Sequence, residues 1–339
     1  MKRSAIRGFD ETLHLQGVSA RTPFLVAAFL CFVLTGCSSY GLISAAPEQS
    51  RPVVVEFTEG QLLGWTDVPA NAYFVPESQL VIVGQPEQVG NVPDTGRPGW
   101  VSATVAAAVL MGGGGTGGRV LGGTGKINLE GMEEVARINL TTLATHMARE
   151  IINTNQFADF FVTSKAPSLP VLSVFTTVIL TYVNDSDAIP FILLKASLSD
   201  SSGQSEVWAT RYFVSSGKPI PVTGEGSWAE LGPAGIESAL APDLKRSINF
   251  MLSDISSPKA RNDNDLYMIQ SRFPYLKERI QTVGHILDED SQSIYFAPKI
   301  DDSMAFSGIH ILDKSVTKYR EAIKGDGGIA GFRVLKERD

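Results

Sequence analysis

The glycine-rich stretch 111–126, MGGGGTGGRVLGGTGK, has the residue types of a phosphate-binding loop. Such a loop needs the pattern G-x-x-x-x-G-K-[ST], in which backbone N–H groups surround the phosphates and a hydroxyl binds magnesium. Gly125 and Lys126 supply the central pair. However, Val120 stands where the first glycine is needed, and Ile127 stands where the hydroxyl is needed. The sequence therefore predicts no nucleotide site here.

Two interpretations of this stretch remain. One is a surface loop, because glycine loses more backbone entropy on ordering than any other residue. The other is a segment that contacts a membrane or a partner, because residues 101–118 carry no charge. In that interpretation, glycines four positions apart would let helices approach closely, as in Gly113/Gly117 and Gly114/Gly118.

Two serine–lysine pairs have the spacing found in penicillin-binding enzymes, Ser215-x-x-Lys218 and Ser256-x-x-Lys259. Two matches to so short a pattern indicate chance, and neither has the companion motifs of those enzymes. The G-x-S-x-G motif of hydrolases does not occur. We therefore predict no catalytic residues and no enzymatic activity.

Histidines are few. His146 and Glu150 stand four residues apart but lack the second histidine of a zinc-protease motif. His285 and His310 would share a metal ion only if their strands were neighbours, and we expect ordinary packing roles instead. The acidic clusters at 262–265 and 288–293 lack the glycine and the terminal glutamate of a calcium loop.

The N-terminus has the pattern of a targeting signal. Lys2, Arg3, Arg7 and Arg21 precede an uncharged apolar run at 23–36. That run has the length of a signal-peptide core and is short for a membrane span. Residues 1–36 are therefore expected to be removed.

The run ends in Leu34-Thr35-Gly36-Cys37, which resembles the lipobox of bacterial lipoproteins. The resemblance implies that a signal peptidase recognises Leu34, Thr35 and Gly36 and cleaves before Cys37. The sulfur of Cys37 would then carry a diacylglycerol, the only covalent or bound group we expect. Ser38 follows, and in this family's sorting pattern a residue other than aspartate there directs the protein to the outer membrane.

The expected mature chain has no free thiol, because Cys31 is removed and Cys37 is lipidated. Cysteine catalysis and disulfides are thereby excluded. Removal of residues 1–36, with four basic and two acidic residues, would leave 25 basic and 34 acidic residues, a net charge of −9. An acidic body has no footprint for nucleic acid. Its membrane attachment would depend on acyl chains, at roughly 0.8 kcal/mol per buried CH₂.

The 339 residues and their 43% hydrophobic share are enough for about two domains. Composition and turn signals divide the chain into successive parts. We expect a signal peptide at 1–36, a flexible tether at 37–51, an α/β domain at 52–255 with a glycine-rich loop at 111–125, a linker at 256–265, and a small, mostly β module at 266–339.

Periodicity predicts the elements within these parts. A strand is expected at 52–57, a helix from near Asn128 to Ile151, and a strand at 157–163. Apolar runs at 170–183, 188–200 and 205–214 predict an antiparallel meander. A second helix is expected at 232–255, kinked or split at Pro242. A short helix is expected at 314–322. Trp208 is assigned to the core rather than to a ligand groove.

The order helix, strand, meander, helix over 130–255, together with the lipobox, is similar in outline to periplasmic α/β lipoproteins of envelope assembly and transport. The N-terminal domain of TolB-like proteins is one example. The resemblance implies helices packed against one face of a mixed sheet. Together with the alternating apolar and polar residues beyond 265, this predicts an α+β fold, with two helices on a mixed, largely antiparallel sheet and a small, mostly β C-terminal module. No functional residue other than Cys37 follows from it.

We therefore expect a non-enzymatic lipoprotein anchored by lipid to the outer membrane and facing the periplasm. It would bind another envelope protein through a sheet edge or an apolar groove. The alternative is an oligomeric export-channel subunit resembling the curli secretion lipoprotein, with the glycine-rich segment entering the membrane. Homo-oligomerisation is left open.

Overall fold

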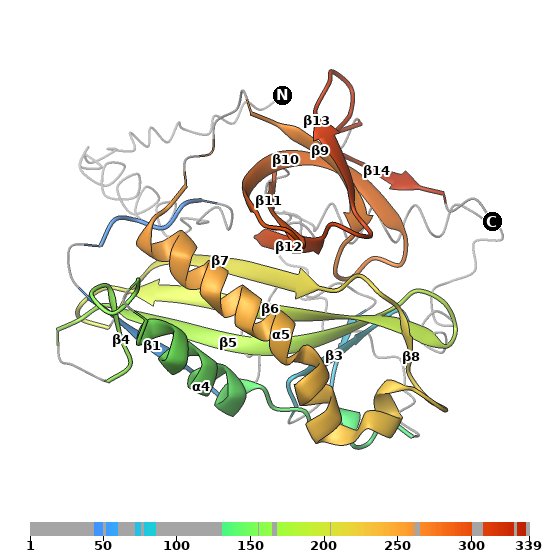
Figure 1. The fold of residues 1–339 in the computed structure, drawn as a ribbon, viewed down its shortest axis with the longest axis horizontal. Helices are drawn as coiled ribbons and strands as arrows, with labels where there is room; N and C mark the ends of the chain where they lie inside the picture. Colours follow the sequence, from blue (N-terminus) through green and yellow to red (C-terminus); the bar gives the residue numbers. More distant parts are fainter. Residues whose placement is uncertain are drawn as a thin grey trace, which may run out of the picture. The chain divides into compact units, whose positions relative to one another are not determined.

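A computed structural model gives the structure of the protein. It describes residues 44–49, 52–59, 72–75, 78–85, 131–154, 156–164, 168–203, 205–259, 261, 265–299, 308–328 and 331–336. Within these ranges, the strands form one sheet of 14 strands, with helices across one of its faces (Figure 1). The lipobox and the glycine-rich stretch lie outside them.

The centre of the sheet is a meander of three long strands, β5 (Val171–Tyr182), β6 (Asp187–Ser199) and β7 (Glu206–Ser215). Both pairings are antiparallel, as predicted. The β5–β6 turn is closed by the Asn184 side chain, whose oxygen accepts the backbone N–H groups of Ser186 at 2.9 Å and of the next residue at 2.7 Å.

Parallel strands extend the meander on the β5 side, which makes the sheet mixed. β1 (Val53–Phe57) and β3 (Leu80–Val83) both lie parallel to β5, one along each half of it. β4 (Phe161–Val162) adds to β1, and β2 (Ala72–Phe74) adds to β3. β8 (Ile220–Pro221) pairs with β6.

The C-terminal strands continue the same sheet, because β12 lies parallel to β7. From β7 outward, the order is β12, β11, β10, β9, β13, with β14 also on β10. Their bounds are β9 Tyr267–Arg272, β10 Arg279–Glu289, β11 Ser293–Pro298, β12 Ile309–Asp313, β13 Lys318–Glu321 and β14 Phe332–Leu335.

The helix expected at 314–322 is wrong, because this segment is a turn followed by the strand β13. All four side chains of β13 are exposed. Pairing with β9 satisfies the backbone groups.

The first helix, α4 (Thr141–Ile152), begins later than the sequence indicates. Residues 131–134 form a turn, and Val135–Arg137 form a 3₁₀ helix, η1. Gly131 has a φ of +74°, and Ile138 is extended with ψ 132°. Both conformations interrupt a continuous helix, so the expected start near Asn128 is wrong for the described part.

The buried side chain of Gln79, the residue directly before β3, fixes the start of α4. The Gln79 carbonyl oxygen accepts the backbone N–H of Leu140 at 2.8 Å and the hydroxyl of Thr176 at 3.0 Å. The Gln79 amide donates to the hydroxyl of Thr141. This residue thus satisfies a helix-terminal N–H that has no intrahelical partner.

The second helix, α5, spans Trp228–Ser256. The Ser227 hydroxyl caps it by accepting the backbone N–H of Glu230 at 3.2 Å. Its non-helical residue is Gly232 (φ 61°, ψ 175°), directly before Pro233. The predicted split at Pro242 is therefore wrong, and a kink there stays a prediction. A proline disfavours the helical conformation in the residue before it. Glycine can take the positive φ found at position 232. The predicted apolar stripe is confirmed as buried: Ile236, Leu240, Leu244, Ile248 and Leu252.

Two apolar cores lie on opposite faces of the meander. Alternate residues of β6, such as Leu194 and Leu198, join the core under α4 and α5. Intervening residues, such as Phe191 and Leu193, join a second core with Phe273 and other residues of the C-terminal region. Burial on both faces explains the nearly continuous apolar run of β6. The predicted fold class, α+β with a mostly β C-terminal region, is confirmed.

Candidate functional site

The segment that follows the lipobox is packed against the body from Ser44 onward. The indole Nε1 of Trp208 donates a hydrogen bond to the Ser44 carbonyl oxygen at 3.1 Å. Ala46 is only 6% exposed and belongs to the core under the helices. Six residues therefore separate Cys37 from the first residue with a described contact to the body.

Trp208 stands near the start of β7, directly opposite Leu198 of β6. Its side chain is 2% exposed and lies in the core, which confirms the core assignment. A buried indole N–H usually finds an acceptor, and here the acceptor comes from a residue 164 positions earlier. This contact fixes the point at which the N-terminal segment joins the sheet.

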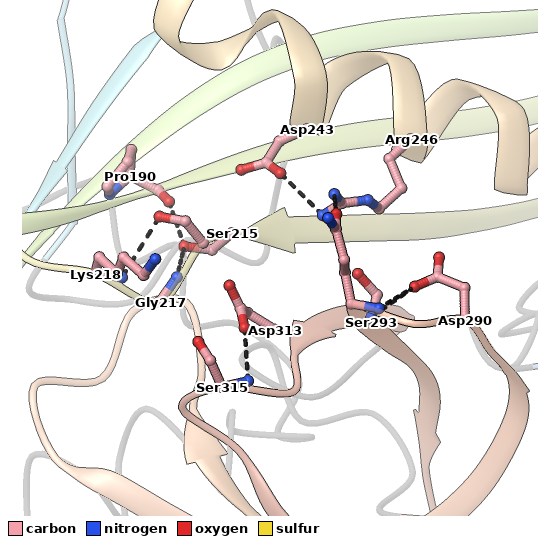
Figure 2. A network of polar contacts seen from close by, with 12 residues as sticks. Pro190, Ser215, Gly217, Lys218, Asp243, Arg246, Asp290, Ser293, Asp313 and Ser315 are labelled. Carbon is pink, nitrogen blue, oxygen red and sulfur yellow. Dashed lines mark hydrogen bonds and ion pairs between the residues drawn. The ribbon is translucent and has the colours of Figure 1, made fainter.

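A polar network joins α5 to the C-terminal strands (Figure 2). Arg246 of α5 contacts Asp243 one turn earlier, with 3.2 Å between Nη1 and Oδ1. Its Nη2 donates to the side-chain oxygen of Gln292 at 2.8 Å. Gln292 lies in the β10–β11 turn, where Asp290 accepts the backbone N–H groups of Gln292 and Ser293, each at 2.7 Å.

The two carboxylates of this network have opposite electrostatic environments. Burial raises the pKa of Asp243, and the charge of Asp313 adds to the rise, while Arg246 opposes it. Burial also acts to raise the pKa of Asp290, but hydrogen bonds from its turn and from the Tyr295 hydroxyl outweigh burial and lower it. Asp290 therefore remains ionised and holds the turn, which is a structural role.

A buried polar cluster lies between α5 and β7. The Tyr212 hydroxyl donates to Oδ2 of Asp254 at 2.9 Å, and both residues are buried. Burial raises the pKa of both groups, and Arg261 acts to lower both. The pKa of Arg261 is itself lowered by burial. The hydrogen bond from Tyr212 and the charge of Arg261 both oppose the effect of burial on the pKa of Asp254, but they do not outweigh it.

Neither serine–lysine pair forms a catalytic dyad. The Ser215 hydroxyl donates to the Pro190 carbonyl at 2.6 Å and accepts the backbone N–H of Gly217 at 3.0 Å, which closes a turn (Figure 2). The Ser256 hydroxyl donates to a carbonyl of its own helix. Lys259 instead contacts Asp288, with 2.7 Å between Nζ and Oδ2.

The structure separates the histidines. His285 of β10 pairs with Ala297 of β11, and His310 of β12 pairs with Phe296. Because adjacent residues of β11 point to opposite faces, the two histidines lie on opposite faces of the sheet and do not share a metal ion. The His310 ring stacks on Phe213 at 4.9 Å between centroids. His146 lies on the exposed side of α4, with 3.7 Å between its Nδ1 and Oε1 of Glu150.

The acidic cluster at 288–290 is held by separate partners. Asp288 contacts Lys259, and Glu289 contacts Lys314 at 3.4 Å. Asp290 accepts the Tyr295 hydroxyl at 2.8 Å. These side chains therefore diverge around a turn rather than facing one another across a cleft. Of the cluster at 262–265, the described residue is 265.

The residues with the most specific sequence signal, Leu34, Thr35, Gly36, Cys37 and Ser38, lie outside the described residues. Sequence reasoning missed the Trp208–Ser44 contact and the buried Asp254. A signal for Asp254 was present, because it follows Phe250 by four residues on the buried side of α5. A carboxylate on a buried helix face requires a polar partner.

Comparisons with known proteins identify no family. No family model matches the chain, and no curated protein matches it. Among solved structures, it is similar to the crystal structure of protein XCC0632 from Xanthomonas campestris, of the family model DUF330. The identity is 14%, the match covers 63% of this chain and 94% of that chain, and the TM-score is 0.28. A match of this quality leaves family membership unassigned.

Proposed function

We propose that the protein is an envelope lipoprotein, anchored to the outer membrane through a lipid on Cys37, with its body in the periplasm as a non-enzymatic binding or assembly factor. The observation that carries this proposal is the sequence Leu34-Thr35-Gly36-Cys37 directly after an uncharged apolar run. A small residue before the cleavage point and a cysteine after it are the requirements of lipid attachment.

The arrangement of the body supports this proposal. Seven positions after Cys37, the carbonyl of Ser44 accepts a hydrogen bond from Trp208 of the body. Among the described residues, no helix is both apolar enough and long enough to cross a bilayer. The hydroxyls of the serine–lysine pairs are engaged in backbone hydrogen bonds.

Lipid attachment is tested by replacing Cys37 with alanine in the full-length precursor. Cells are grown with a radioactive or clickable palmitate analogue, and their membranes are separated by density. We expect the unmodified protein to be labelled and to fractionate with the outer membrane, and C37A to be unlabelled. Labelling of C37A, or an unlabelled native protein, would overturn the proposal.

We propose β13 as the partner-binding edge. Within the described residues, β13 pairs with β9 alone, so its other edge has no strand partner there and can accept a strand of another protein. Such a strand would replace the contact of Arg320 Nη1 with the Glu321 carbonyl at 2.8 Å. The backbone N–H of Ala322 donates to the Leu266 carbonyl. Antiparallel bonding alternates, so the N–H of Glu321 points away from β9.

This geometry gives a selective variant. Glu321→Pro removes the outward N–H donor without removing a bond to β9, whereas Glu321→Ala retains the donor and serves as the matched control. After crosslinking in cells, we expect envelope proteins recovered with the native chain and with E321A to be lost with E321P. Recovery of the same proteins with E321P would exclude this edge.

A further inference from the structure

We propose that one defined end of the meander, the end with the β6–β7 turn at residues 200–205, faces the lipid headgroups, and that the long strands stand upright on the bilayer. This orientation rests on the proposed lipid anchor at Cys37. It identifies the membrane-facing surface of the body and leaves the opposite end and the C-terminal strands available to partners.

The connection between the lipidated cysteine and the body is short. Seven Cα–Cα steps lead from Cys37 to Ser44, and a fully extended chain advances at most ~3.3–3.6 Å per residue, or about 25 Å in total. Ser44 is held by Trp208, and Ala46 is buried in the core. Ser44 therefore lies within about 25 Å of Cys37, the residue that would carry the lipid.

The Ser44–Trp208 contact lies at one end of the meander. Trp208 pairs with Leu198, and the next pair, Ser199 with Glu206, ends the two strands at the β6–β7 turn. At the same end, Ser199 also pairs with Val171, the first residue of β5. The N-terminal segment thus reaches the sheet at the end where β6 finishes and where β5 and β7 begin.

The body is long in the direction of the strands. β6 runs for 13 residues from Asp187 to Ser199, which corresponds to about 40 Å at ~3.3 Å per residue. The β5–β6 turn at 183–186 therefore lies well beyond the reach of the short connection. In a body held this way, the β6–β7 turn lies close to the bilayer and the β5–β6 turn lies far from it.

Charge decides between an upright body and one lying along the surface. The expected mature chain carries 25 basic and 34 acidic residues. Anionic lipid headgroups repel an excess of acidic residues and attract basic ones. Lying flat would bring the acidic residues along the whole body to the headgroups, whereas standing upright brings only those of the near end, such as Asp200 and Glu206. The upright position is therefore favoured.

The test uses single cysteines, because the lipidated mature chain has no other free thiol. Ser201 and Asp185 are exposed residues in the turns at the two ends of β6, so Ser201→Cys and Asp185→Cys form a matched pair. Each lipidated variant is labelled with a donor dye and placed in phosphatidylethanolamine–phosphatidylglycerol vesicles containing an acceptor-labelled lipid. We expect several-fold more efficient energy transfer from position 201 than from position 185.

A tether variant checks the cause of this contrast. Inserting about sixteen Gly/Ser residues between Tyr40 and Gly41 adds a maximal reach of roughly 55 Å. We expect the contrast between positions 201 and 185 to fall sharply in this variant. If Ser201→Cys does not fold, Ser205→Cys, in the same exposed turn, takes its place.

The outcomes separate the anchor from the orientation. Proteins that fail to float with the vesicles would contradict the lipid anchor itself. Proteins that float, yet transfer energy equally from both turns or more efficiently from position 185, would overturn the orientation while leaving the anchor intact. An unchanged contrast after the Gly/Ser insertion would also overturn it, because the short connection would then not be its cause.

Discussion

The phenol of Tyr212 on β7 donates a 2.9 Å hydrogen bond to the carboxylate of Asp254 on α5, and both side chains are buried between the sheet and the helix. The same tyrosine ring lies edge-on to Phe250, one helical turn before Asp254. A polar contact is therefore enclosed in the apolar core that joins the longest helix to the meander. The Tyr212 hydroxyl and the Asp254 carboxylate are hydrogen-bonded to each other. Removing either group should therefore lower the free energy of unfolding by a predictable amount.

Replacing Tyr212 with phenylalanine keeps the ring and removes the donor. The Asp254 carboxylate then loses its hydrogen bond in a buried position, which costs about 1–3 kcal/mol. We expect a lower free energy of unfolding in urea, with little change in secondary structure. Tyr319→Phe is the matched control, because Tyr319 is 39% exposed and its partner Glu289 is exposed as well. Equal costs for the two variants would contradict the buried role.

Asp254 also gives a pH dependence with a definite sign. Burial raises its pKa above 3.8, so the folded protein keeps this proton to a higher pH than the unfolded chain does. Between pH 3.8 and the raised pKa of the folded state, the folded protein binds more protons than the unfolded chain does. The stability that Asp254 contributes therefore falls as pH rises through this window. In Asp254→Asn, the amide oxygen still accepts from Tyr212, but nothing titrates.

We therefore expect the free energy of unfolding of D254N, relative to the native protein, to increase as pH rises through this window. Asp243 shifts in the same direction and is present in both proteins, so its effect cancels in the difference. Urea titrations at a series of pH values measure this quantity. A difference that stays constant or decreases with pH would show that Asp254 does not have a raised pKa.

Trp208→Phe tests the contact that joins the N-terminal segment to the sheet. The variant removes the indole donor from the Ser44 carbonyl, and because Ser44 is exposed the cost is that of one ordinary hydrogen bond, about 0.5–1.5 kcal/mol. We expect faster amide hydrogen exchange over residues 44–49, with β12 unchanged. Trp228→Phe is the control, because Trp228 is equally buried but its Nε1 has no hydrogen-bond partner in the described part of the chain. Faster exchange of 44–49 in both variants would indicate general loosening.

The link between α5 and the β10–β11 turn is open to a double-mutant cycle. Arg246→Met keeps the aliphatic stem, and Gln292→Ala removes the acceptor. Both groups are partly exposed to solvent, so we expect a coupling of only about 0.5–1 kcal/mol. Unfolding in urea measures the four proteins. A coupling near zero would mean that the 2.8 Å contact adds nothing to the attachment of the C-terminal strands.

The elements with a strong local period were predictable from the sequence. The meander follows from three apolar runs separated by polar turns, and the α5 stripe follows from apolar residues at four-residue intervals. Errors occurred where tertiary contacts override the local pattern. The residues before α4 have a helical period, but the side chain of Gln79, which lies directly before β3, sets the helix start. A single sequence carries no signal for such a contact.

The candidate site shows the same division. A lipobox is a local motif, and the sequence alone therefore supports a proposal at Cys37. The separation of His285 and His310 depends on their register with adjacent residues of β11, and register between distant strands is not visible in the sequence. The Trp208–Ser44 contact joins residues 164 positions apart, so only the folded chain brings them together.

The parallel pairing of β12 with β7 joins the C-terminal strands to the meander. Gly308, directly before β12, has a φ of +121°, and a Cβ there would lie 2.5 Å from the Arg211 carbonyl oxygen and 2.8 Å from the Arg211 Cβ. Alanine at this position combines backbone strain with a clash against β7, which together cost about 2–5 kcal/mol.

Gly203→Ala is the control, because Gly203 has a φ of +71° but faces open space, so strain alone costs about 1–2 kcal/mol. We expect G308A to lower the free energy of unfolding by more than G203A does, and to speed hydrogen exchange in β12 before β5. Equal costs, or unaltered exchange in β12, would show that the close approach of Gly308 to Arg211 does not hold the C-terminal strands to the meander.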